Sequence, residues 1–315
     1  MLKRNFIVSL TGGLGNQLFQ LAAGLKISEG KEVHLTAAYG NPRPFNKDTA
    51  DLYSFFLPNN VNIINKKTAA LLVKKCVGYN LRMGTDPRKY ENLKIVKWFI
   101  KCATNSLLFL DLHQSFTLVA GKGVGFSKIS KSKKNSLLVG YFQSYKWAVE
   151  SNVFKALKTI KPIEESLLLE SLIRKAKAEK PLFVHVRLTD YKNEEKIGIP
   201  SKDYYFNSVK ELMKSEGFSK IWLFSDEAET AKNYIPDEFK EILTMIPEID
   251  GSPALTLELL RHGSGYVIAN SSFSWWGAFL SYEENVRVIA PYPWFRNLAS
   301  PLDLIPPNWE TNYPW

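Results

Sequence analysis

The C-terminal half of the chain alternates between short apolar runs, which favour buried strands, and segments whose apolar residues recur every three or four positions, which favour helices. The predicted strands are 181–186, 219–225, 241–246, 265–270 and 286–291, and the predicted helices are 202–217, 226–235, 252–263 and 272–284. Ser252 suits the residue before a helix, and Pro253 suits its first turn. Strands and helices that alternate in this way predict an α/β fold with a parallel sheet.

The N-terminal half begins with the same pattern and then becomes less regular. Its first predicted elements are a strand at 5–10, a glycine-rich turn at 12–17, a helix at 17–30 and a strand at 32–38. Further along, the pattern predicts helices at 66–76, 145–160 and 163–180 and a strand at 136–144. Because Lys161-Pro162 separates two predicted helices, we predict domains 1–160 and 161–315. We expect the C-terminal tail to pack back on the N-terminal domain.

Polar side chains follow three of the predicted C-terminal strands. They are His185, Arg187 and Asp190 at the first strand, Ser225 and Asp226 at the second, and Asn270, Ser271 and Ser272 at the fourth. Ligands of open parallel sheets bind outside the carboxyl ends of the strands. We therefore expect these three loops to converge on one crevice.

Composition and charge narrow the class of protein. The chain has 315 residues with 45% hydrophobic and 23% charged, which is typical of globular domains and excludes global disorder. Its apolar runs are far shorter than the roughly 20 residues that span a bilayer, so we predict no membrane anchor. The two cysteines, Cys76 and Cys102, form neither a disulfide framework nor a metal motif. Reduced thiols of this kind predict a cytoplasmic protein.

The net charge of +10 favours an anionic partner: nucleic acid, an anionic membrane or a phosphorylated small molecule. No zinc-finger or RNA-binding signature is present, so we expect no nucleic acid. The basic surplus is concentrated in 121–135. We favour a solvated loop there over a contact with an anionic ligand or with the inner face of a membrane.

The glycine-rich turn 12-GGLGNQ-17 is the first candidate for chemistry. Glycines allow positive φ and close approach of a ligand to the backbone, and amides at a helix start can hold an anion. The turn lacks the third glycine of a dinucleotide fingerprint and the Lys-Ser/Thr of a P-loop. A tight turn that caps a helix is the competing interpretation, but Asn16 and Gln17 are well placed to orient a hydroxylated ligand.

Two further segments suit the binding of phosphate. In 185-HVRLTDY-191, Arg187 can grip a phosphate and Asp190 can fix its guanidinium; a structural Arg–Asp pair beside a core histidine is equally compatible. In 270-NSSFSWWGAF-279, hydroxyl groups and amides stand at a helix start, whereas the aromatic residues read as core. The adjacent Asp226 and Glu227 point in different directions and make a poor acid–base pair. There is no Asp-x-Asp motif, which favours arginine over a metal for neutralising phosphate charge.

Together these motifs resemble those of the bacterial α-1,2-fucosyltransferases of glycosyltransferase family 11. The similar segments are 12-GGLGNQLFQLAAG-24, 139-VGYFQS-144, 185-HVRLTDY-191, 224-FSDE-227 and 269-ANSSFSWWGAFL-280, in the family's order. The resemblance implies a GT-B-like fold in which two Rossmann-type domains face a cleft, the C-terminal one a parallel sheet with helices on both faces. It also implies an inverting enzyme without metal or other cofactor, which transfers L-fucose from GDP-fucose to the 2-hydroxyl of a terminal galactoside.

The resemblance further implies residue roles. Arg187 would hold the β-phosphate of GDP, Asp190 would orient Arg187, and His185 would lie against the nucleotide. The remaining donor contacts implied are Asp226, Asn270, Ser271, Ser272, Gly13 and Gly15. Asn16 and Gln17 would face the acceptor, with Asn16 also counted among the catalytic residues beside Arg187 and Asp190. No residue is identified as a base.

One departure keeps alternatives open. The family usually reads His-x-Arg-Arg-Gly-Asp-Tyr, whereas this chain has Leu188 and Thr189 in the middle, closer to the His-x-Arg-x-Thr-Asp of α-1,6-fucosyltransferases. The same fold could therefore make another linkage or use another nucleotide sugar. The third hypothesis is a non-catalytic module that binds glycans or acidic polymers. The acceptor is expected to be a galactose-terminated oligosaccharide or a lipid-linked glycan.

Overall fold

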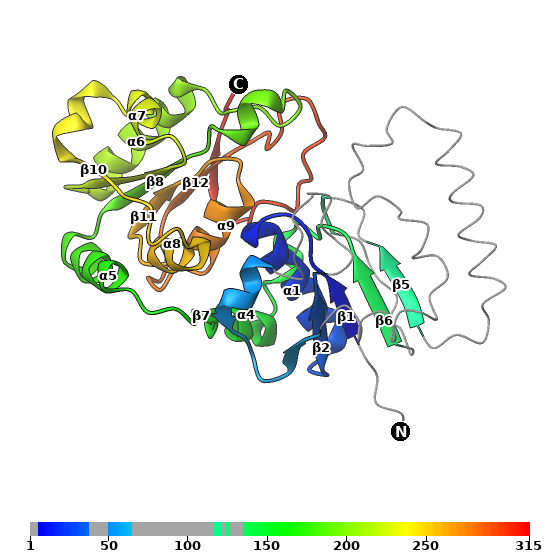
Figure 1. The fold of residues 1–315 in the computed structure, drawn as a ribbon. Helices are drawn as coiled ribbons and strands as arrows, with labels where there is room; N and C mark the ends of the chain where they lie inside the picture. Colours follow the sequence, from blue (N-terminus) through cyan, green and yellow to red (C-terminus); the bar gives the residue numbers. More distant parts are fainter. Residues whose placement is uncertain (1–5, 38–49, 65–115, 121–123, 127–134) are drawn as a thin grey trace. The chain divides into compact units, whose positions relative to one another are not determined.

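The computed structural model describes residues 6–37, 50–64, 116–120, 124–126 and 135–315 (Figure 1). The chain divides into two compact units, Met1–Ile160 and Lys161–Trp315. The helix expected at 66–76 and most of the basic segment 121–135 lie outside the described residues. Among the described residues, no helix has both the length and the apolar character needed to cross a bilayer.

The N-terminal unit contains a parallel five-stranded sheet with the order β4-β2-β1-β6-β5. Its strands are β1 (Phe6–Ser9), β2 (Val33–Thr36), β4 (Val61–Ile63), β5 (Phe116–Ala120) and β6 (Asn135–Val139). The other elements described in this unit are β3 (Phe55–Phe56), α1 (Leu14–Ser28), α4 (Ser151–Lys158) and 3-10 turns at Asp51–Ser54 and Tyr145–Trp147. Gly24 lets α1 pack closely on β1, because a Cβ atom there would lie 2.7 Å from Cγ2 of Val8.

Two expected elements of this unit are shorter than the sequence pattern suggested. The strand expected at 136–144 ends at Val139, because Gly140 and Phe142 adopt positive φ values of 138° and 53°. The helix expected at 145–160 is divided into a 3-10 turn and α4. Ser144 caps that turn by accepting a hydrogen bond from the Lys146 amide at 3.2 Å, which starts a separate short element.

The C-terminal unit contains a six-stranded parallel sheet with the order β10-β9-β8-β11-β12-β13. Its strands are β8 (Leu182–Val186), β9 (Ile221–Ser225), β10 (Leu243–Met245), β11 (Gly265–Val267), β12 (Val288–Pro291) and β13 (Glu310–Asn312); β7 (Lys161–Pro162) precedes them. Chain order reverses between β8 and β11, as in a Rossmann-type sheet. The loops after these two strands therefore flank the switch point at which such sheets bind ligands.

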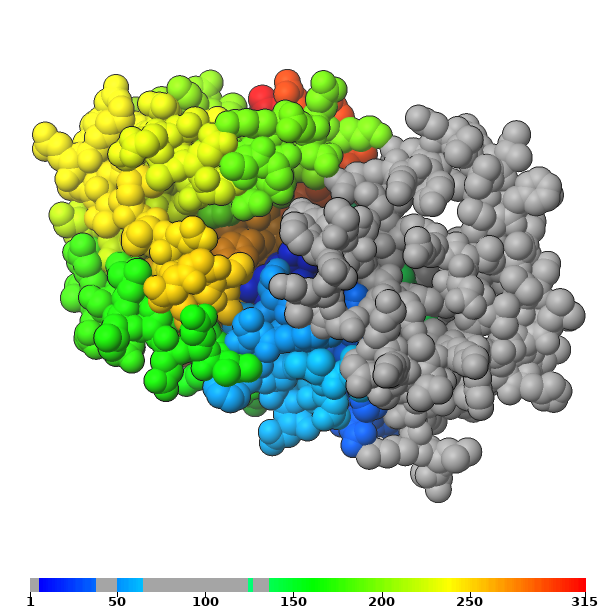
Figure 2. Space-filling view, viewed as in Figure 1, coloured from blue at the N-terminus to red at the C-terminus, as the bar shows by residue number. Residues whose placement is uncertain are grey.

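Helices cover both faces of this sheet: α6 and α7 lie over one face, and α5, α8 and α9 over the other (Figure 1). Their bounds are α5 (Leu167–Glu179), α6 (Lys202–Glu216), α7 (Ala228–Ala231), α8 (Pro253–Leu260) and α9 (Ser272–Phe279). Short 3-10 helices span Asp190–Asn193, Lys232–Tyr234 and Asp237–Ile242. The helix α5 lies at the surface (green, Figure 2), where Leu167 is 84% exposed.

Alternation along β8 determines which side chains face which layer. Val184 and Val186 belong to the core cluster that includes α6 residues. The intervening His185 faces the other layer, where its ring centroid lies 6.3 Å from that of Phe273 in α9. Successive side chains of a strand point to opposite faces, so His185 emerges on the α9 side of the sheet edge.

The structure confirms Ser252 as the residue before α8, with Pro253 in its first turn. The helix expected at 226–235 is only the single turn of α7 followed by a 3-10 turn, and α9 ends at Phe279 rather than near 284. The C-terminal tail ends in a strand that the sequence pattern did not predict. It forms β13, whose Glu310 pairs with Arg287 at 2.7 Å and so holds the tail beside β12.

Candidate functional site

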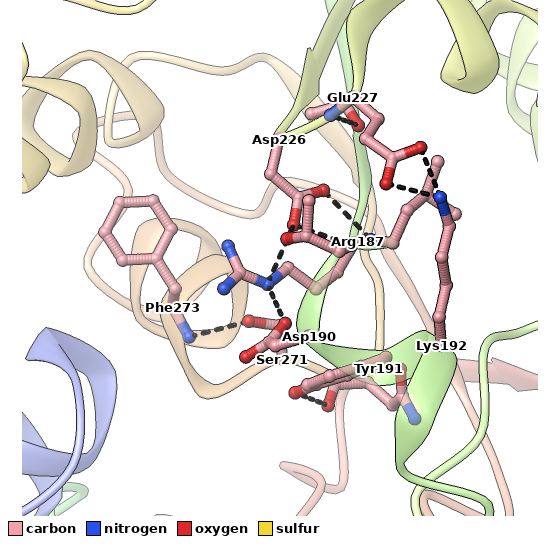
Figure 3. Close-up of polar contacts among 12 residues, drawn as sticks. Arg187, Asp190, Tyr191, Lys192, Asp226, Glu227, Ser271 and Phe273 are labelled. Carbon is pink, nitrogen blue, oxygen red and sulfur yellow. Dashed lines mark hydrogen bonds and ion pairs between the residues drawn. The ribbon is translucent and has the colours of Figure 1, made fainter. Parts of the chain in front are cut away.

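Arg187 follows directly after β8, and two carboxylates contact its Nε atom (Figure 3). Its Nε donates to Oδ1 of Asp190 at 2.8 Å and lies 3.3 Å from Oδ2 of Asp226. Within the part of the chain that the structure describes, neither terminal nitrogen of Arg187 has a hydrogen-bond partner, and the side chain is 35% exposed. Burial lowers the pKa of Arg187, but Asp190 and Asp226 outweigh burial and raise it. The result is a permanent cation with its terminal nitrogens available to an anion.

Asp226 holds the loop that carries Arg187. Its Oδ1 accepts from the Leu188 amide at 2.9 Å, and its Oδ2 accepts from the Thr189 amide at 3.0 Å and from the Thr189 hydroxyl. Burial would raise the pKa of Asp226, but the bonds from Thr189 and Leu188 and the charge of Arg187 lower it. The family resemblance implied a donor contact for Asp226, which stays a prediction; within the chain both of its oxygens accept hydrogen bonds.

His185 is neutral and almost fully buried. Burial first, and the positive charge of Arg187 second, lower the pKa of His185 to about 4, with a partial opposing effect from Asp226. Its Nδ1 atom is buried and has no hydrogen-bond partner among the described residues. The structure thus places an uncharged ring with an unused nitrogen beside Arg187.

The start of α9 supplies the other half of the site. Ser271 caps the helix by accepting from the Phe273 amide at 3.3 Å, and Ser272 is the first helical residue. Asn270 is buried, and its amide nitrogen donates to the carbonyl oxygens of Ile197 and Gly198. Asn270 therefore fixes the 197–198 loop with its amide hydrogens, and its expected contact with the donor stays a prediction. Its Oδ1 atom has no partner among the described residues.

Trp275 and Trp276 of α9 are fully buried core residues, as the sequence predicted, whereas Phe273 is only half-buried. Gly277 permits close packing of α9 on α8, since a Cβ atom there would lie 2.7 Å from Cβ of Leu260.

Three loops meet at this sheet edge as predicted, but two residues that join them were not foreseen. The hydroxyl of Tyr191 donates to the carbonyl oxygen of Asn270 at 3.2 Å, which joins the loop after β8 to the loop after β11. Lys192 contacts both oxygens of Glu227 at 2.5 and 2.7 Å, which joins the first loop to the loop after β9. Tyr191 closes the motif 185–191, so its place in that motif was the available signal.

The glycine-rich turn of the N-terminal unit is held by neutral amides. Gln17 is only 4% exposed; its Oε1 accepts from the Leu52 amide and its Nε2 donates to the Gly12 carbonyl, both at 2.8 Å. The sequence assigned Gln17 to the acceptor, but both ends of its side chain are used inside the unit. Oδ1 of Asn16 accepts from Gln143 at 2.6 Å.

The backbone of this turn explains its glycines. Gly12 has a φ of +74°, and a Cβ atom there would come 2.5 Å from Nδ2 of Asn16. Gly13 has a φ of −78° and open space around its Cβ position; Gly15 is buried in the first turn of α1. Gln20 was missed: it is fully buried, accepts from the Thr11 amide at 3.0 Å and donates to the Gly140 carbonyl at 3.0 Å.

Among the described residues, no group of three or more His, Cys, Asp or Glu side chains is arranged to hold a metal ion.

Comparison with known proteins gives a family and an architecture. The model of the family described as Glycosyl transferase family 11 matches residues 94–309, more than half of the chain. An Escherichia coli alpha-1,2-colitosyltransferase is 28% identical and covers 96% of this chain and 97% of its own. The Escherichia coli O-antigen biosynthesis glycosyltransferase WbnK is 26% identical over 91% of this chain and 93% of its own.

Among solved structures, NodZ alpha-1,6-fucosyltransferase co-crystallized with GDP has a TM-score of 0.50 and 15% identity, covering 89% of this chain and 93% of its own. Another structure of NodZ, from Bradyrhizobium, has the same TM-score and coverage. This likeness concerns the fold. Together with the two parallel sheets it confirms the predicted GT-B-like architecture of two α/β units, the C-terminal one with helices on both faces of its sheet.

Proposed function

The chain belongs to glycosyl transferase family 11, and from that premise we propose that it transfers L-fucose from GDP-fucose to the 2-hydroxyl group of a terminal galactoside, with inversion and without a metal ion. A GDP-bound solved structure with the same fold supports a GDP-sugar donor. The 1,2-linkage is supported by the linkage in the name of the colitosyltransferase relative.

One observation carries the proposal: the Arg187 guanidinium is gripped at Nε by Asp190 and Asp226, while its terminal nitrogens are left without partners in the described chain. A guanidinium in this state can donate two parallel hydrogen bonds to phosphate oxygens. The capped start of α9 adds amide donors at the same sheet edge. We assign the β-phosphate of GDP to these groups.

The reaction needs charge stabilisation on the departing diphosphate. The bond between the sugar C1 and the β-phosphate oxygen breaks, and its electron pair stays on that oxygen. The acceptor oxygen forms the new bond to C1 from the opposite face, and its proton passes to water. Arg187 stabilises the developing negative charge in place of a divalent cation. His185, which stays neutral, contacts the nucleotide without adding charge. In the N-terminal unit we propose Asn16, with Gly13 and Gly15, as the sugar-contacting residues.

A second candidate donor is the GDP-linked form of colitose, and the observation that favours it is the 28% identity with a colitosyltransferase over nearly the whole chain. The Leu188-Thr189 pair keeps a 1,6-linkage as a further alternative. These alternatives keep the same Arg187 chemistry and differ in the sugar or in the acceptor hydroxyl.

The test is a product analysis. The protein is incubated with GDP-fucose or GDP-colitose and a panel of galactose-terminated oligosaccharides, with and without EDTA. GDP release and the linkage of the product are then measured. We expect a 2-linked fucoside at the same rate in EDTA. Preference for GDP-colitose would replace the donor, a 6-linked product would replace the linkage, and loss of activity in EDTA would reject the metal-independent mechanism.

A further inference from the structure

Tyr191 connects the two segments of the chain to which we assign the β-phosphate. It follows Asp190 in the 3-10 helix Asp190–Asn193, on the segment that carries Arg187. Its hydroxyl donates to the carbonyl oxygen of Asn270, the residue that precedes the helix cap Ser271, at 3.2 Å (Figure 3). One side chain therefore links the loop after β8 to the cap of α9.

The strand pairing alone does not fix the positions of the loops after β8 and β11 relative to each other. The pairing between β8 and β11 ends at Val184 and Val267. Arg187 and Ser271 lie beyond this last pair, so the β8–β11 pairing does not reach them. Small movements of either loop would change the distance between the guanidinium and the helix start. A link beyond the end of the ladder is what limits such movement.

The hydroxyl of Tyr191 is suited to a permanent link. Burial, and then the negative charge of Asp190, raise the pKa of Tyr191 to about 12, although Arg187 and Ser271 act in the opposite direction. The hydroxyl therefore remains protonated at every physiological pH and keeps its proton for the Asn270 carbonyl.

We propose that Tyr191 is a positioning residue that sets the separation of Arg187 from the start of α9, so that both act on the same diphosphate. This inference rests on the proposed function. It assigns Tyr191 no contact with the substrate: the residue acts through the two loops that it joins. The β-phosphate is the group that needs both loops, so the affinity for GDP should depend on Tyr191 more than the affinity for GMP does.

The chain offers a matched control in Tyr204. Its hydroxyl also donates to backbone carbonyl oxygens of this unit, Ile268 at 2.7 Å and Ile289 at 3.2 Å, and the residue is fully buried. Tyr204 belongs to the core under α6 rather than to the Arg187 loop. Tyr204→Phe therefore removes a comparable hydrogen bond without loosening the link between the two loops.

The experiment compares the full-length wild type, Tyr191→Phe and Tyr204→Phe. Isothermal titration gives the dissociation constants of GDP and GMP, steady-state kinetics give kcat and KM for GDP-fucose, and thermal unfolding gives Tm. We expect Tyr191→Phe to weaken GDP about tenfold and to lower kcat/KM about tenfold, with GMP affinity kept within about twofold. Tyr204→Phe is expected to lower Tm and leave the ratio of the GDP and GMP constants unchanged.

The outcomes separate the inference from the proposed function. If the wild type is active and Tyr191→Phe keeps its full preference for GDP over GMP, the inference is overturned and the proposed function stands. If Tyr191→Phe loses GMP binding together with GDP binding, the residue is structural and the inference is again overturned. If the wild type neither binds GDP nor releases it from GDP-fucose, the proposed function fails and takes the inference with it.

Discussion

The loops that follow β1 and β8 occupy equivalent places in two parallel sheets, yet they are built from opposite chemistry. Each of these strands is the first, in chain order, of its parallel sheet and lies inside that sheet, with neighbours on both sides. After β1 come glycines held by the neutral amides of Gln17 and Gln20. After β8 comes Arg187, held by Asp190 and Asp226.

The two loops differ in which polar side-chain atoms remain without a partner within the described chain. In the N-terminal turn the amide groups of Gln17 and Gln20 are spent on backbone partners, so these side chains stabilise the turn itself. In the C-terminal loop the carboxylates engage only Nε of Arg187 and leave its terminal nitrogens for an anion. Substitutions of Gln17 or Gln20 should therefore affect stability, and substitution of Arg187 should affect chemistry.

The largest effect is expected for Arg187→Ala. Loss of a preorganised cation at the departing diphosphate should lower kcat by about 10²–10³-fold. The free energy of unfolding should change little, because the side chain is partly exposed and its ion pairs are worth about 1 kcal/mol or less. GDP release and thermal unfolding measure the two effects.

Arg187→Lys serves as the companion variant. It keeps the charge but not the planar fork, and should recover only part of the activity. Full activity in Arg187→Ala would contradict the proposal that the loop after β8 acts in the reaction through Arg187.

The sequence was sufficient to predict which residues gather at the edge of the C-terminal sheet, but not which hydrogen-bond partners the polar side chains have. Alternating apolar blocks predicted the parallel C-terminal sheet, and the end-of-strand rule then placed Arg187, Asp226 and Ser271 together. The internal hydrogen bonds of Gln17 and Asp226 were not foreseen because their partners, the amides of Leu52 and Leu188, lie far away in the sequence. Local pattern carries no information on which distant backbone group will approach a side chain.

The missed β13 has a related cause. Its sequence, Glu-Thr-Asn, is short and polar, and its place beside β12 depends on pairing with Arg287 across a long connection. Gln20 lies within a segment that the sequence singled out, and a fully buried glutamine on an apolar helix could have been suspected of binding backbone. Its partner Gly140 became visible only in the fold.

The next effect in size is expected in the N-terminal turn. Gln20→Met fills the same space but leaves the Thr11 amide and the carbonyls of Thr11 and Gly140 without their partner. Buried groups left unpaired should lower the free energy of unfolding by about 3 kcal/mol. Urea denaturation measures this change, and titration with GDP provides the control, since we expect unaltered GDP affinity in the folded fraction. A stable variant that binds GDP poorly would contradict the division of roles.

A smaller effect should appear in the pH dependence of stability, and it should arise from His185, which lies in β8 beside Arg187. Burial lowers the pKa of His185 from 6.5 to about 4. Between these two pH values His185 is protonated in the unfolded chain but not in the folded chain. Stability is complete above pH 6.5 and falls as the pH is lowered towards 4, by about 2 kcal/mol at pH 5. Denaturation at a series of pH values should show this slope in the wild type.

His185→Gln is the control, because glutamine does not titrate. Its stability should fall less steeply between pH 6.5 and 5 than that of the wild type, with the remaining slope coming from carboxylates. Identical slopes in the two proteins would mean that folding leaves the pKa of His185 unchanged, which would contradict the prediction.

The smallest effect is expected where this chain departs from the usual family motif. Thr189→Val removes the hydroxyl that donates to Asp226, while the amides of Leu188 and Thr189 and Nε of Arg187 remain as partners of the carboxylate. An exposed hydrogen bond of this kind is worth about 1 kcal/mol or less, so Tm should fall by roughly 2 °C and kcat/KM by no more than about threefold. Thr189→Ser keeps the hydroxyl and should match the wild type in both. A loss of activity much larger than threefold in Thr189→Val, with Tm preserved and rescue by serine, would show that the hydroxyl acts on the substrate. The loop after β8 would then use a neutral group for chemistry as well as its cation, and the contrast with the amide-held turn after β1 would be one of degree.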